Sequence, residues 1–388
     1  MGIKQLNKII KKVAPSAITE HDIHEFVNCK IAIDSAILMY KYRYASQDST
    51  DSHIHGFVQR VCFYLKRGIL PIFVFDGIPP EAKKFTLDKR IKQKSKIEEK
   101  INQLINTRAG GSLSQNSKDL YNEQIEYLDI DEEINKLSKQ VTYVTKNHRQ
   151  ECKYLLKLLG IPVIESNGEA ENTCAFLQKK GIVDYTFTED TDALTFGAPY
   201  VLKSAKKIEK VIKINLNEVL EKTGFNMESF IDFCILCGCD YCPTIPKIGP
   251  VTAFNLITNF KNIETILDNL DPKYKVPEDF DYITARKLFN HDPLEDKIFD
   301  LNINDIQINK LKDFLVEEKE LSVQVYKNII NKYNKSLLDY KKTNKDKKNL
   351  TILNFFKKSQ SSSESESKNT NSEPLLSESL LSESLLSG

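Results

Sequence analysis

The sequence KIAID occupies residues 30–34, and PIFVFD follows at residues 71–76. Each is a short apolar run that ends in one aspartate, and TFTEDTD at residues 186–192 closes with two. Apolar runs of this length are typical of buried strands. Stretches with helical spacing lie between them, over residues 56–67, 151–159 and 171–180. Because strands alternate with helices, the sequence predicts an α/β fold with a mostly parallel central sheet flanked by helices.

The acids that end these runs form the second signal. The carboxyl ends of parallel strands lie along one edge of a sheet, so acids that end separate strands converge there. Glu169 and Glu171 follow a further apolar run at residues 161–164, and Asp240 ends the run CILCGCD. The candidate metal ligands are therefore seven acids: Asp34, Asp76, Glu169, Glu171, Asp190, Asp192 and Asp240.

Clustered carboxylates indicate a particular chemistry. They repel one another, and they stay ionised together only when cations lie among them. Oxygen ligands without clustered histidine or thiolate select Mg²⁺ or Mn²⁺ over Zn²⁺. Two such ions ~4 Å apart activate water and stabilise the leaving oxygen of a phosphodiester. One strand-end aspartate is more often a turn former or helix N-cap, but seven acids at such positions favour phosphoryl hydrolysis.

Composition limits the other possibilities. The chain has 388 residues, a net charge of +1 and a mean hydropathy of −0.39, which fits two or three globular domains. No apolar run approaches the ~20 residues of a membrane span, and no signal peptide is visible, so we expect an intracellular protein without a membrane partner and with reduced cysteines. Basic stretches at residues 81–100 and 340–358 predict contact with a polyanion.

Six segments together resemble the flap endonuclease branch of the xeroderma pigmentosum G-like (XPG-like) 5′ nuclease family. They are MGIKQLNKIIKKVAPSAI from residue 1, KIAIDSAILMYKY from 30, VFDGIPPEAKK from 74, VTKNHRQECKYLLKLLGIPVIESNGEAEN from 144, TEDTDALTFGAP from 188 and CGCDYCPTIPKIGPVTA from 237. The resemblance implies a PIN-like 5′ nuclease fold and a magnesium-dependent enzyme that cuts DNA at 5′ flaps in replication and repair, with 5′–3′ exonuclease activity. It also implies that all seven acids serve one two-metal centre, in which Mn²⁺ can substitute.

The resemblance and the changes in composition together divide the chain. Residues 81 to about 140 are charged and helix-favouring, and NTRAGGSLSQNS at residues 106–117 predicts a flexible loop between two helices. The low-complexity end from Ser359 predicts a disordered tail. The expected parts are the nuclease core at 1–80 and 146–260, an inserted helical arch at 81–145, a helical region at 261–340, and a basic clamp-binding peptide with the tail at 341–388.

Two cations in the arch are candidate catalytic residues. Lys83 and Arg90 are seven residues apart, about two helical turns, so they would lie on one helix face. The resemblance implies that this helix forms the base of the arch and that both side chains contact the scissile phosphate. A solvated lysine-rich helix is the alternative, and it fits Lys92, Lys94 and Lys96 better.

The resemblance also assigns DNA contacts. Tyr40 would stack on a base beside the scissile phosphate, although a buried core tyrosine is nearly as good an account. Gly2 would lie near the active site once Met1 is removed. Ile245–Ile257 would form a helix–two-turn–helix element that holds a duplex phosphate and a K⁺ ion, with Lys247 where the family usually has glycine, Gly249 at the helix start, and Val251 and Thr252 in place of basic residues.

Two further motifs remain. Cys234, Cys237, Cys239 and Cys242 lie too close in sequence to wrap one zinc ion, so buried thiols are the better interpretation. NLTILNFF at residues 349–356 resembles a peptide that binds the sliding clamp (PCNA), with Ile352, Phe355 and Phe356 as anchors, and a last helical turn packed on the core is its alternative.

Two alternative functions and one alternative location stay open. The first is a sister enzyme of the same family: a 5′ exonuclease, a junction resolvase or an excision nuclease. The second is a non-catalytic scaffold that binds DNA junctions and the clamp. The third concerns location, since the resemblance implies a nuclear monomer whereas a viral source would place it at a cytoplasmic site of DNA replication.

Overall fold

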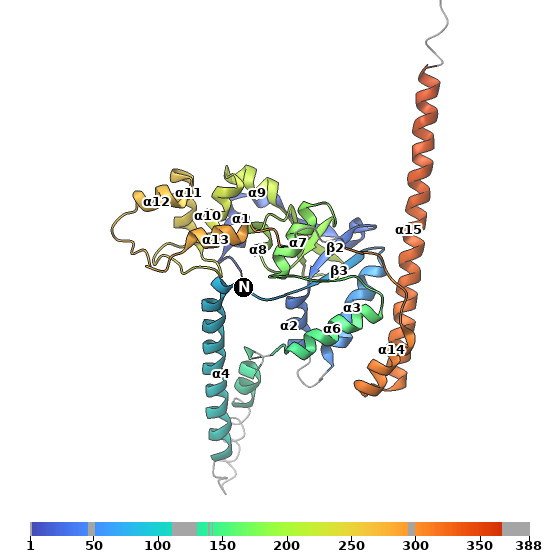
Figure 1. Cartoon of the computed structure of the whole chain (residues 1–388), viewed down its shortest axis with the longest axis horizontal. Helices are drawn as coiled ribbons and strands as arrows, with labels where there is room; N and C mark the ends of the chain where they lie inside the picture. The colour runs from blue at the N-terminus through green and yellow to red at the C-terminus, as the bar shows by residue number, and fades with distance from the viewer. Residues whose placement is uncertain are drawn as a thin grey trace, which may run out of the picture. The chain divides into compact units, whose positions relative to one another are not determined.

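The computed structural model describes residues 2–45, 51–110, 130–138, 140–141, 143–293 and 299–366. The chain divides into two units, Met1–Lys341 and Lys342–Gly388. The first unit contains the whole sheet and nearly all of the helices (Figure 1). No helix within the described ranges is long and apolar enough to cross a membrane.

A seven-stranded mixed sheet forms the centre of the first unit, in the order β1-β7-β6-β5-β2-β3-β4. Strands β2 to β6 pair in parallel, whereas β7 runs antiparallel to both β6 and β1. The predicted, mostly parallel sheet is therefore confirmed. The strands are β1 Ile18–Asp22, β2 Lys30–Asp34, β3 Leu70–Phe75, β4 Val163–Glu165, β5 Tyr185–Phe187, β6 Tyr200–Ser204 and β7 Lys210–Asn215.

The four strands predicted from sequence, at residues 30–33, 70–75, 161–164 and 185–188, match β2, β3, β4 and β5, and the largest shift of a boundary is at β4. The sequence places the third strand at residues 161–164, whereas β4 begins at Val163. Proline has no backbone N–H to donate, and Pro162 contributes only its carbonyl, which accepts from the Phe73 N–H. The strand therefore starts one residue after the proline.

Alternation along the strands sends side chains into two different cores. Ile31, Ile33 and Phe73 pack with α3 (Ser52–Leu65) and α6 (Lys146–Leu158) on one face of the sheet. Ala32 and Ile72 face the other side, where α7 (Ala170–Lys179) covers them. Figure 1 shows α3 and α6 together on one side of β2 and β3. Both faces are thus buried, as a parallel sheet requires.

A third core joins helices to the β6–β7 end of the sheet. Its buried residues come mainly from the first helix and from the helices after β7. This region confirms the expectation that the chain after Asp240 is mainly helical. The helices are α1 Leu6–Val13, α8 Asp192–Thr195, α9 Leu216–Thr223, α10 Met227–Cys237, α11 Pro250–Phe260, α12 Ile263–Asp268 and α13 Tyr282–Phe289.

The inserted arch lies between β3 and β4, which are neighbours in the sheet. It begins with the short helix η3 (Glu81–Lys83) and continues as α4, Lys84–Gly110. The helix extends into the predicted loop at residues 106–117, and residues 111–129 lie outside the described residues. Residues 130–138 are helical again, as the sequence predicts.

The chain ends in α14 (Ile308–Lys312), the π-helical turn η4 (Asp313–Glu318) and the long helix α15 (Val323–Glu366). Tyr326, Ile329 and Tyr333 anchor the first turns of α15 in the core beside α6. The remaining low-complexity residues, 367–388, lie outside the described residues.

Candidate metal centre

The strand-end acids lie where the parallel register places them. Asp34 is the last residue of β2, opposite Val74 of β3, and Asp76 follows the end of β3. The segment after β5 brings Asp190 and Asp192, which starts α8. These acids come from β5, β2 and β3, which are adjacent in the sheet. They therefore share one edge.

Two more acids come from the start of α7, and one follows α10. Glu169 is the N-cap of α7 and Glu171 lies in its first turn, where the helix dipole favours negative charge. Asp240 follows the end of α10 and joins the group through its interactions with Lys83 and Arg90.

Local hydrogen bonds fix the orientation of several of these carboxylates. Asp34 accepts from the Thr188 hydroxyl at 2.9 Å and from the Ala36 N–H at 2.9 Å. Asp76 accepts from the Ala170 N–H at 2.9 Å, which ties the end of β3 to the start of α7. Thr188 also accepts from the Asp190 N–H at 3.1 Å. One threonine hydroxyl thus aligns the acids of two neighbouring strands.

Burial and mutual repulsion oppose ionisation at the centre. Burial, followed by the charge of Asp76, raises the pKa of Asp34 to about 7. Burial, followed by the charges of Asp76 and Asp240, raises the pKa of Glu169 to about 8. The pKa values of Glu171 and Asp192 also lie well above their usual values, because both side chains are buried among the other acids. Such a set of oxygen ligands fits divalent cations, which remove the repulsion.

These shifts predict a pH dependence of stability. The folded-state pKa values of Asp34 and Glu169 exceed the unfolded values near 4, so their stabilising effect is complete below about pH 4 and is lost as pH rises to about 8. We expect the melting temperature of chelator-treated protein to fall between pH 5 and pH 8.5. Mg²⁺ should raise it more at pH 8.5 than at pH 5. Thermal melts of the wild type and of Glu169→Gln would test this, since the variant should show a shallower fall; equal slopes would contradict the prediction.

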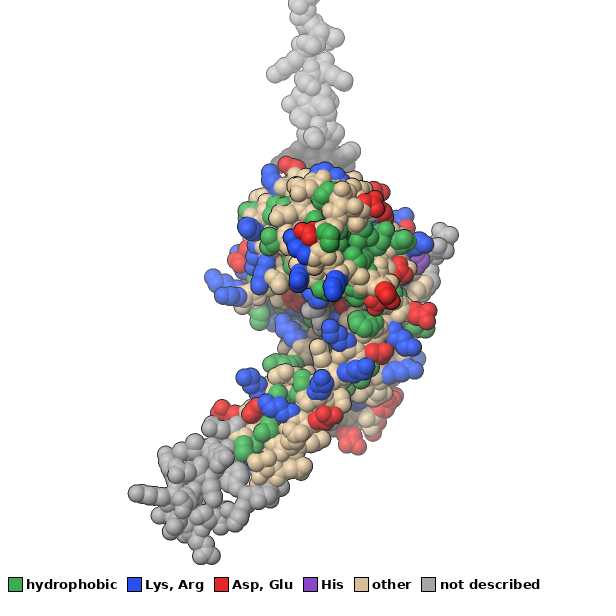
Figure 2. All heavy atoms as spheres, turned by 90° about the vertical axis from the view of Figure 1, so that its left-hand side faces the viewer, with side chains coloured by type: hydrophobic (Ala, Val, Ile, Leu, Met, Phe, Trp, Pro, Cys, Tyr) green, Lys and Arg blue, Asp and Glu red, His purple; other side chains and the backbone are tan. Residues whose placement is uncertain are grey.

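The two predicted catalytic cations contact these acids. Lys83 donates to Glu169, and its Nζ lies 3.6 Å from Asp240 Oδ2. Arg90 Nη2 donates to both oxygens of Asp240, at 2.9 and 2.6 Å. The base of the arch is therefore held against the acidic edge by ion pairs. Figure 2 shows Lys and Arg side chains spread over the arch that extends from the sheet domain.

The N-terminal segment also contacts the acids. The Ile3 N–H donates to Asp192 Oδ1 at 2.6 Å. Gly2 has φ +81°, and a Cβ at this position would overlap the Asp190 carboxylate. Glycine is therefore the residue that lets the chain approach this closely. The structure places Gly2 beside the metal-site acids.

Tyr40 lies on α2 (Ser35–Ala45), and its side chain is 41% exposed, which excludes the core alternative. Lys94 of α4 places its Nζ 5.7 Å from the centre of the Tyr40 ring and 4.4 Å from that of Tyr143. Tyr143 is 51% exposed and donates to Glu98. The sequence interpretation treated Lys94 as a solvated lysine and did not identify Tyr143. No motif marks these two residues, because their approach to Tyr40 joins segments that are far apart in the sequence.

Tyr241 is a further residue that sequence reasoning missed. Its hydroxyl donates to Glu169 Oε2, so it restrains a predicted metal ligand from the segment that carries Asp240. The signal was present in the motif CGCDYC, where Tyr241 directly follows Asp240. The sequence interpretation used only the aspartate and the cysteines of this motif.

The expected helix start near residue 250 is present. Gly249 is the N-cap of α11 and Pro250 its first residue, whereas Lys247 is exposed in the preceding turn with φ +68°. This left-handed conformation explains physically why glycine suits the position of Lys247. Gly249 has φ −107°, and a Cβ there would meet nothing within 4 Å, so its backbone would accept other residues.

The cysteine-rich segment holds free thiols. Cys234, Cys237, Cys239 and Cys242 are all buried, and none belongs to a group of three or more metal-ligating atoms within the described residues. Their burial agrees with the interpretation of this segment as buried thiols.

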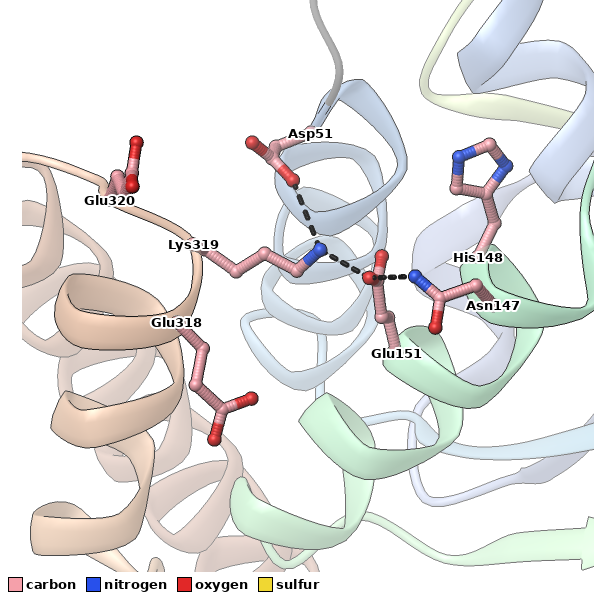
Figure 3. Close-up of a pocket in the computed structure, with 7 residues that line it drawn as sticks. All are labelled: Asp51, Asn147, His148, Glu151, Glu318, Lys319 and Glu320. Atoms are coloured by element: carbon pink, nitrogen blue, oxygen red, sulfur yellow. Dashed lines mark hydrogen bonds and ion pairs between the residues drawn. The ribbon is translucent and has the colours of Figure 1, made fainter.

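A different set of ligand-type atoms does lie within 4.8 Å of one another in the described part of the chain: those of Asp51, His53 and Glu151. Lys319 donates to Glu151 and lies 3.6 Å from Asp51 (Figure 3). His53 Nε2 lies 2.7 Å from Glu151 Oε2. A cavity of about 250 Å³ adjoins this group. Because the Lys319 ammonium already lies against both carboxylates, we interpret the group as an ion-pair network that ties the end of η4 to α3 and α6.

The clamp-binding anchors cannot be placed in the same detail. The backbone of α15 runs through Ile352, Phe355 and Phe356, but their side chains lie outside the described residues. Their role stays a prediction.

Comparison with known proteins shows which sequences and folds are similar. The XPG N-terminal domain model matches residues 1–97, and the XPG I-region model matches residues 160–240. Flap endonuclease 1 of Entamoeba dispar is 40% identical over 338 residues, which cover 83% of this chain and 84% of that protein. Flap endonuclease 1-B of Xenopus laevis is 38% identical over 343 residues, or 83% of each chain.

Solved structures agree in fold. The catalytic core of Rad2 in complex with DNA substrate matches 86% of this chain and 100% of that chain, with a TM-score of 0.63 at 20% identity. Flap endonuclease-1 from Methanococcus jannaschii matches 83% of this chain and 97% of that chain, with a TM-score of 0.58 at 26% identity. The two family-model matches, residues 1–97 and 160–240, together contain all seven candidate acids.

Proposed function

The chain belongs to the flap endonuclease branch of the XPG-like 5′ nuclease family, and we propose that it hydrolyses DNA phosphodiesters at 5′ flap junctions by a two-magnesium mechanism. The observation that carries this proposal is the convergence of buried acids from neighbouring strands on one edge of the sheet. A scaffold that only binds DNA would have no reason to keep repelling carboxylates together. An intact acidic edge therefore favours an enzyme.

We propose that the seven acids hold two Mg²⁺ ions, with Mn²⁺ able to substitute. The donor set fits, because it consists of carboxylate oxygens that are partly buried and mutually repelling. When bound, the ions supply a nucleophilic water and stabilise charge on the leaving oxygen. Lys83 lies against Glu169 and Asp240, and Arg90 lies against Asp240, so both cations end beside the candidate ligands.

Lys83 and Arg90 are proposed to bind and orient the scissile phosphate. Both side chains are partly buried and end at the acidic edge of the sheet, where a phosphate bound at the site would contact them. Cations there stabilise the negative charge that develops as the P–O bond breaks. Tyr40, with its exposed ring beside Lys94, would stack on a neighbouring base.

The experiment is a magnesium titration of cleavage with a labelled double-flap DNA. We expect no product in chelator, and product that rises with Mg²⁺ and maps to the flap junction. Nicked, bubble and four-way substrates in parallel would separate a flap enzyme, with or without 5′–3′ exonuclease activity, from an excision nuclease or a junction resolvase. Binding of flap DNA without cleavage at any Mg²⁺ or Mn²⁺ concentration would support the scaffold alternative instead.

Lys247 gives a separate prediction for duplex binding. Replacing it with glycine should relieve the left-handed strain and stabilise the protein by about 1 kcal/mol, while the loss of the exposed ammonium weakens duplex binding. The slope of log affinity against log salt should fall by about one. Lys247→Asn is the matched control, because asparagine tolerates φ > 0 but carries no charge. An unchanged salt slope in both variants would exclude a phosphate contact by Lys247.

The partner, the bound K⁺ and the location of the protein are also proposals. We propose that residues 349–356 bind a sliding clamp, that the turn before α11 binds K⁺ with the duplex, and that the protein acts as a nuclear monomer. The motif NLTILNFF and the lysine-rich run before it support the first and the last of these. A pull-down with purified clamp and a Phe355→Ala/Phe356→Ala variant would test the clamp interaction.

A further inference from the structure

Cys239 and Cys242 form a close pair beside the metal centre. Their Sγ atoms lie 3.9 Å apart, both thiols are free, and each residue is buried with 9% of its surface exposed. Cys234 and Cys237, on α10, are more deeply buried. Among the described residues, the thiol–thiol contact that the structure shows is the one between Cys239 and Cys242.

The two residues enclosed by this pair both reach the metal centre. Asp240 binds Arg90 through both carboxylate oxygens, and its carbonyl accepts from the Thr86 hydroxyl at 3.1 Å. Tyr241 donates to Glu169. Any movement of the short segment between the two cysteines is therefore passed to two predicted metal ligands and to the base of the arch.

The backbone between Gly238 and Gly249 is not part of a helix. α10 ends at Cys237, Gly238 follows with φ +108°, and α11 begins only at Pro250. A disulfide needs an S–S distance of about 2.0 Å, so closing the pair shortens the present separation of 3.9 Å by nearly half. The Cys239–Cys242 segment would have to shift or rotate to allow it.

We propose that Cys239 and Cys242 are a modification site, oxidised by a peroxide to a reversible disulfide that displaces Asp240 and Tyr241 and lowers the nuclease activity. The site regulates the activity proposed above and rests on that function. The disulfide acts by displacing neighbouring residues, because neither thiol is a predicted metal ligand and neither takes part in phosphodiester hydrolysis.

The chemistry balances with hydrogen peroxide as the oxidant. One thiolate attacks a peroxide oxygen, the O–O bond breaks, and a sulfenic acid and one water result once the released hydroxide is protonated. The second thiol then attacks the sulfenic sulfur, the S–O bond breaks, and a second water leaves as the S–S bond forms. Two electrons pass from the sulfurs to the peroxide. A dithiol reductant reverses the modification by thiol–disulfide exchange.

The test uses the full chain, reduced and then treated with hydrogen peroxide. Peptide mass spectrometry after thiol blocking should show a Cys239–Cys242 link that has lost two hydrogen atoms. Cleavage of double-flap DNA should fall by about 10- to 100-fold, because misplacing catalytic groups by about 1 Å costs that much. Mn²⁺ affinity, measured by electron paramagnetic resonance, should weaken, and dithiothreitol should restore both properties.

Matched variants separate this site from general oxidation. Cys239→Ser should keep its activity in peroxide, and Cys242→Ser should do the same if the first variant folds poorly. Cys29→Ser, which removes the most exposed thiol, should remain as sensitive as the wild type.

Three results would overturn the proposal: no Cys239–Cys242 link, a link that leaves cleavage and Mn²⁺ affinity unchanged, or a Cys239→Ser protein that peroxide still inactivates reversibly. Reduced protein that never cleaves flap DNA would refute the proposed function instead. The mass and Mn²⁺ measurements would still decide whether the dithiol acts on the metal site.

Discussion

Asp192→Asn should reduce cleavage of flap DNA by about 1,000-fold or more at saturating Mg²⁺ while flap binding stays close to that of the wild type. Metal-assisted stabilisation of a phosphoryl transition state is worth several kcal/mol, and each 1.36 kcal/mol is tenfold in rate. Asp192 is buried among the acids at the start of α8 and accepts from the Ile3 N–H. Asparagine keeps the size and the acceptor for that N–H but removes the charge. Single-turnover kinetics and a filter-binding titration would measure the two effects.

Glu189→Gln is the matched control for this prediction. Glu189 lies in the same TFTEDTD segment, but its carboxylate accepts from the Ser204 N–H and is not among the predicted ligands. The loss of cleavage in Glu189→Gln should be at least 100-fold smaller than the loss in Asp192→Asn, since Glu189→Gln removes no predicted metal ligand. Equal losses in both variants, or near wild-type turnover by Asp192→Asn, would refute the proposed metal centre.

Lys83→Met should lower the turnover rate by about 100- to 1,000-fold without weakening metal binding. Removing one preorganised donor to developing charge costs this much in other enzymes. Lys83 contacts Glu169 and approaches Asp240, so its removal takes positive charge away from the acids and should leave Mn²⁺ affinity equal or tighter. The combination of slower chemistry and undiminished metal affinity distinguishes a role at the phosphate from a purely structural ion pair. Rapid-quench kinetics and Mn²⁺ binding would supply the two readouts.

Lys92→Met tests whether the effect of Lys83→Met depends on the position of Lys83 or on the overall positive charge of the arch. Lys92 is exposed on the same helix, two residues after Arg90, and the sequence analysis assigned it to solvent. Its replacement should alter turnover by no more than about twofold, as expected for a surface charge. A comparable loss in both variants would mean that the arch acts through its overall positive charge.

The acids could be predicted from sequence because two rules place them. A short apolar run that ends in Asp34 or Asp76 marks the end of a buried strand, and parallel strands share their carboxyl edge. The register of β2 with β3 and β5 follows this expectation. Asp240 was a candidate because it ends the run CILCGCD, but it follows a helix rather than a strand, so the sheet edge alone does not place it. Its contacts with Lys83 and Arg90, and the effect of its charge on Glu169, show its approach to the site.

Other parts of the fold left weaker signals. β1 reads ITEHD and lies at the sheet edge, where polar residues are tolerated, so it has no apolar run to detect. β6 and β7 form the antiparallel end of the sheet, and their lysines interrupt the apolar pattern. The contact of Tyr143 with Lys94, and that of Lys319 with Glu151, depend on how distant helices pack, and the sequence does not encode these contacts locally.

The arch leaves the sheet after β3, and the chain re-enters the core through α6 before it reaches β4, the hydrogen-bonded neighbour of β3. Both ends of the insertion are therefore anchored in the core by contacts that do not depend on what lies between them. Evolution could lengthen, shorten or replace this segment without disturbing the register that aligns the acids. Exchange of residues 91–145 between relatives, which leaves Lys83 and Arg90 in place, is accordingly a direct route to enzymes with the same chemistry and a different choice of DNA geometry.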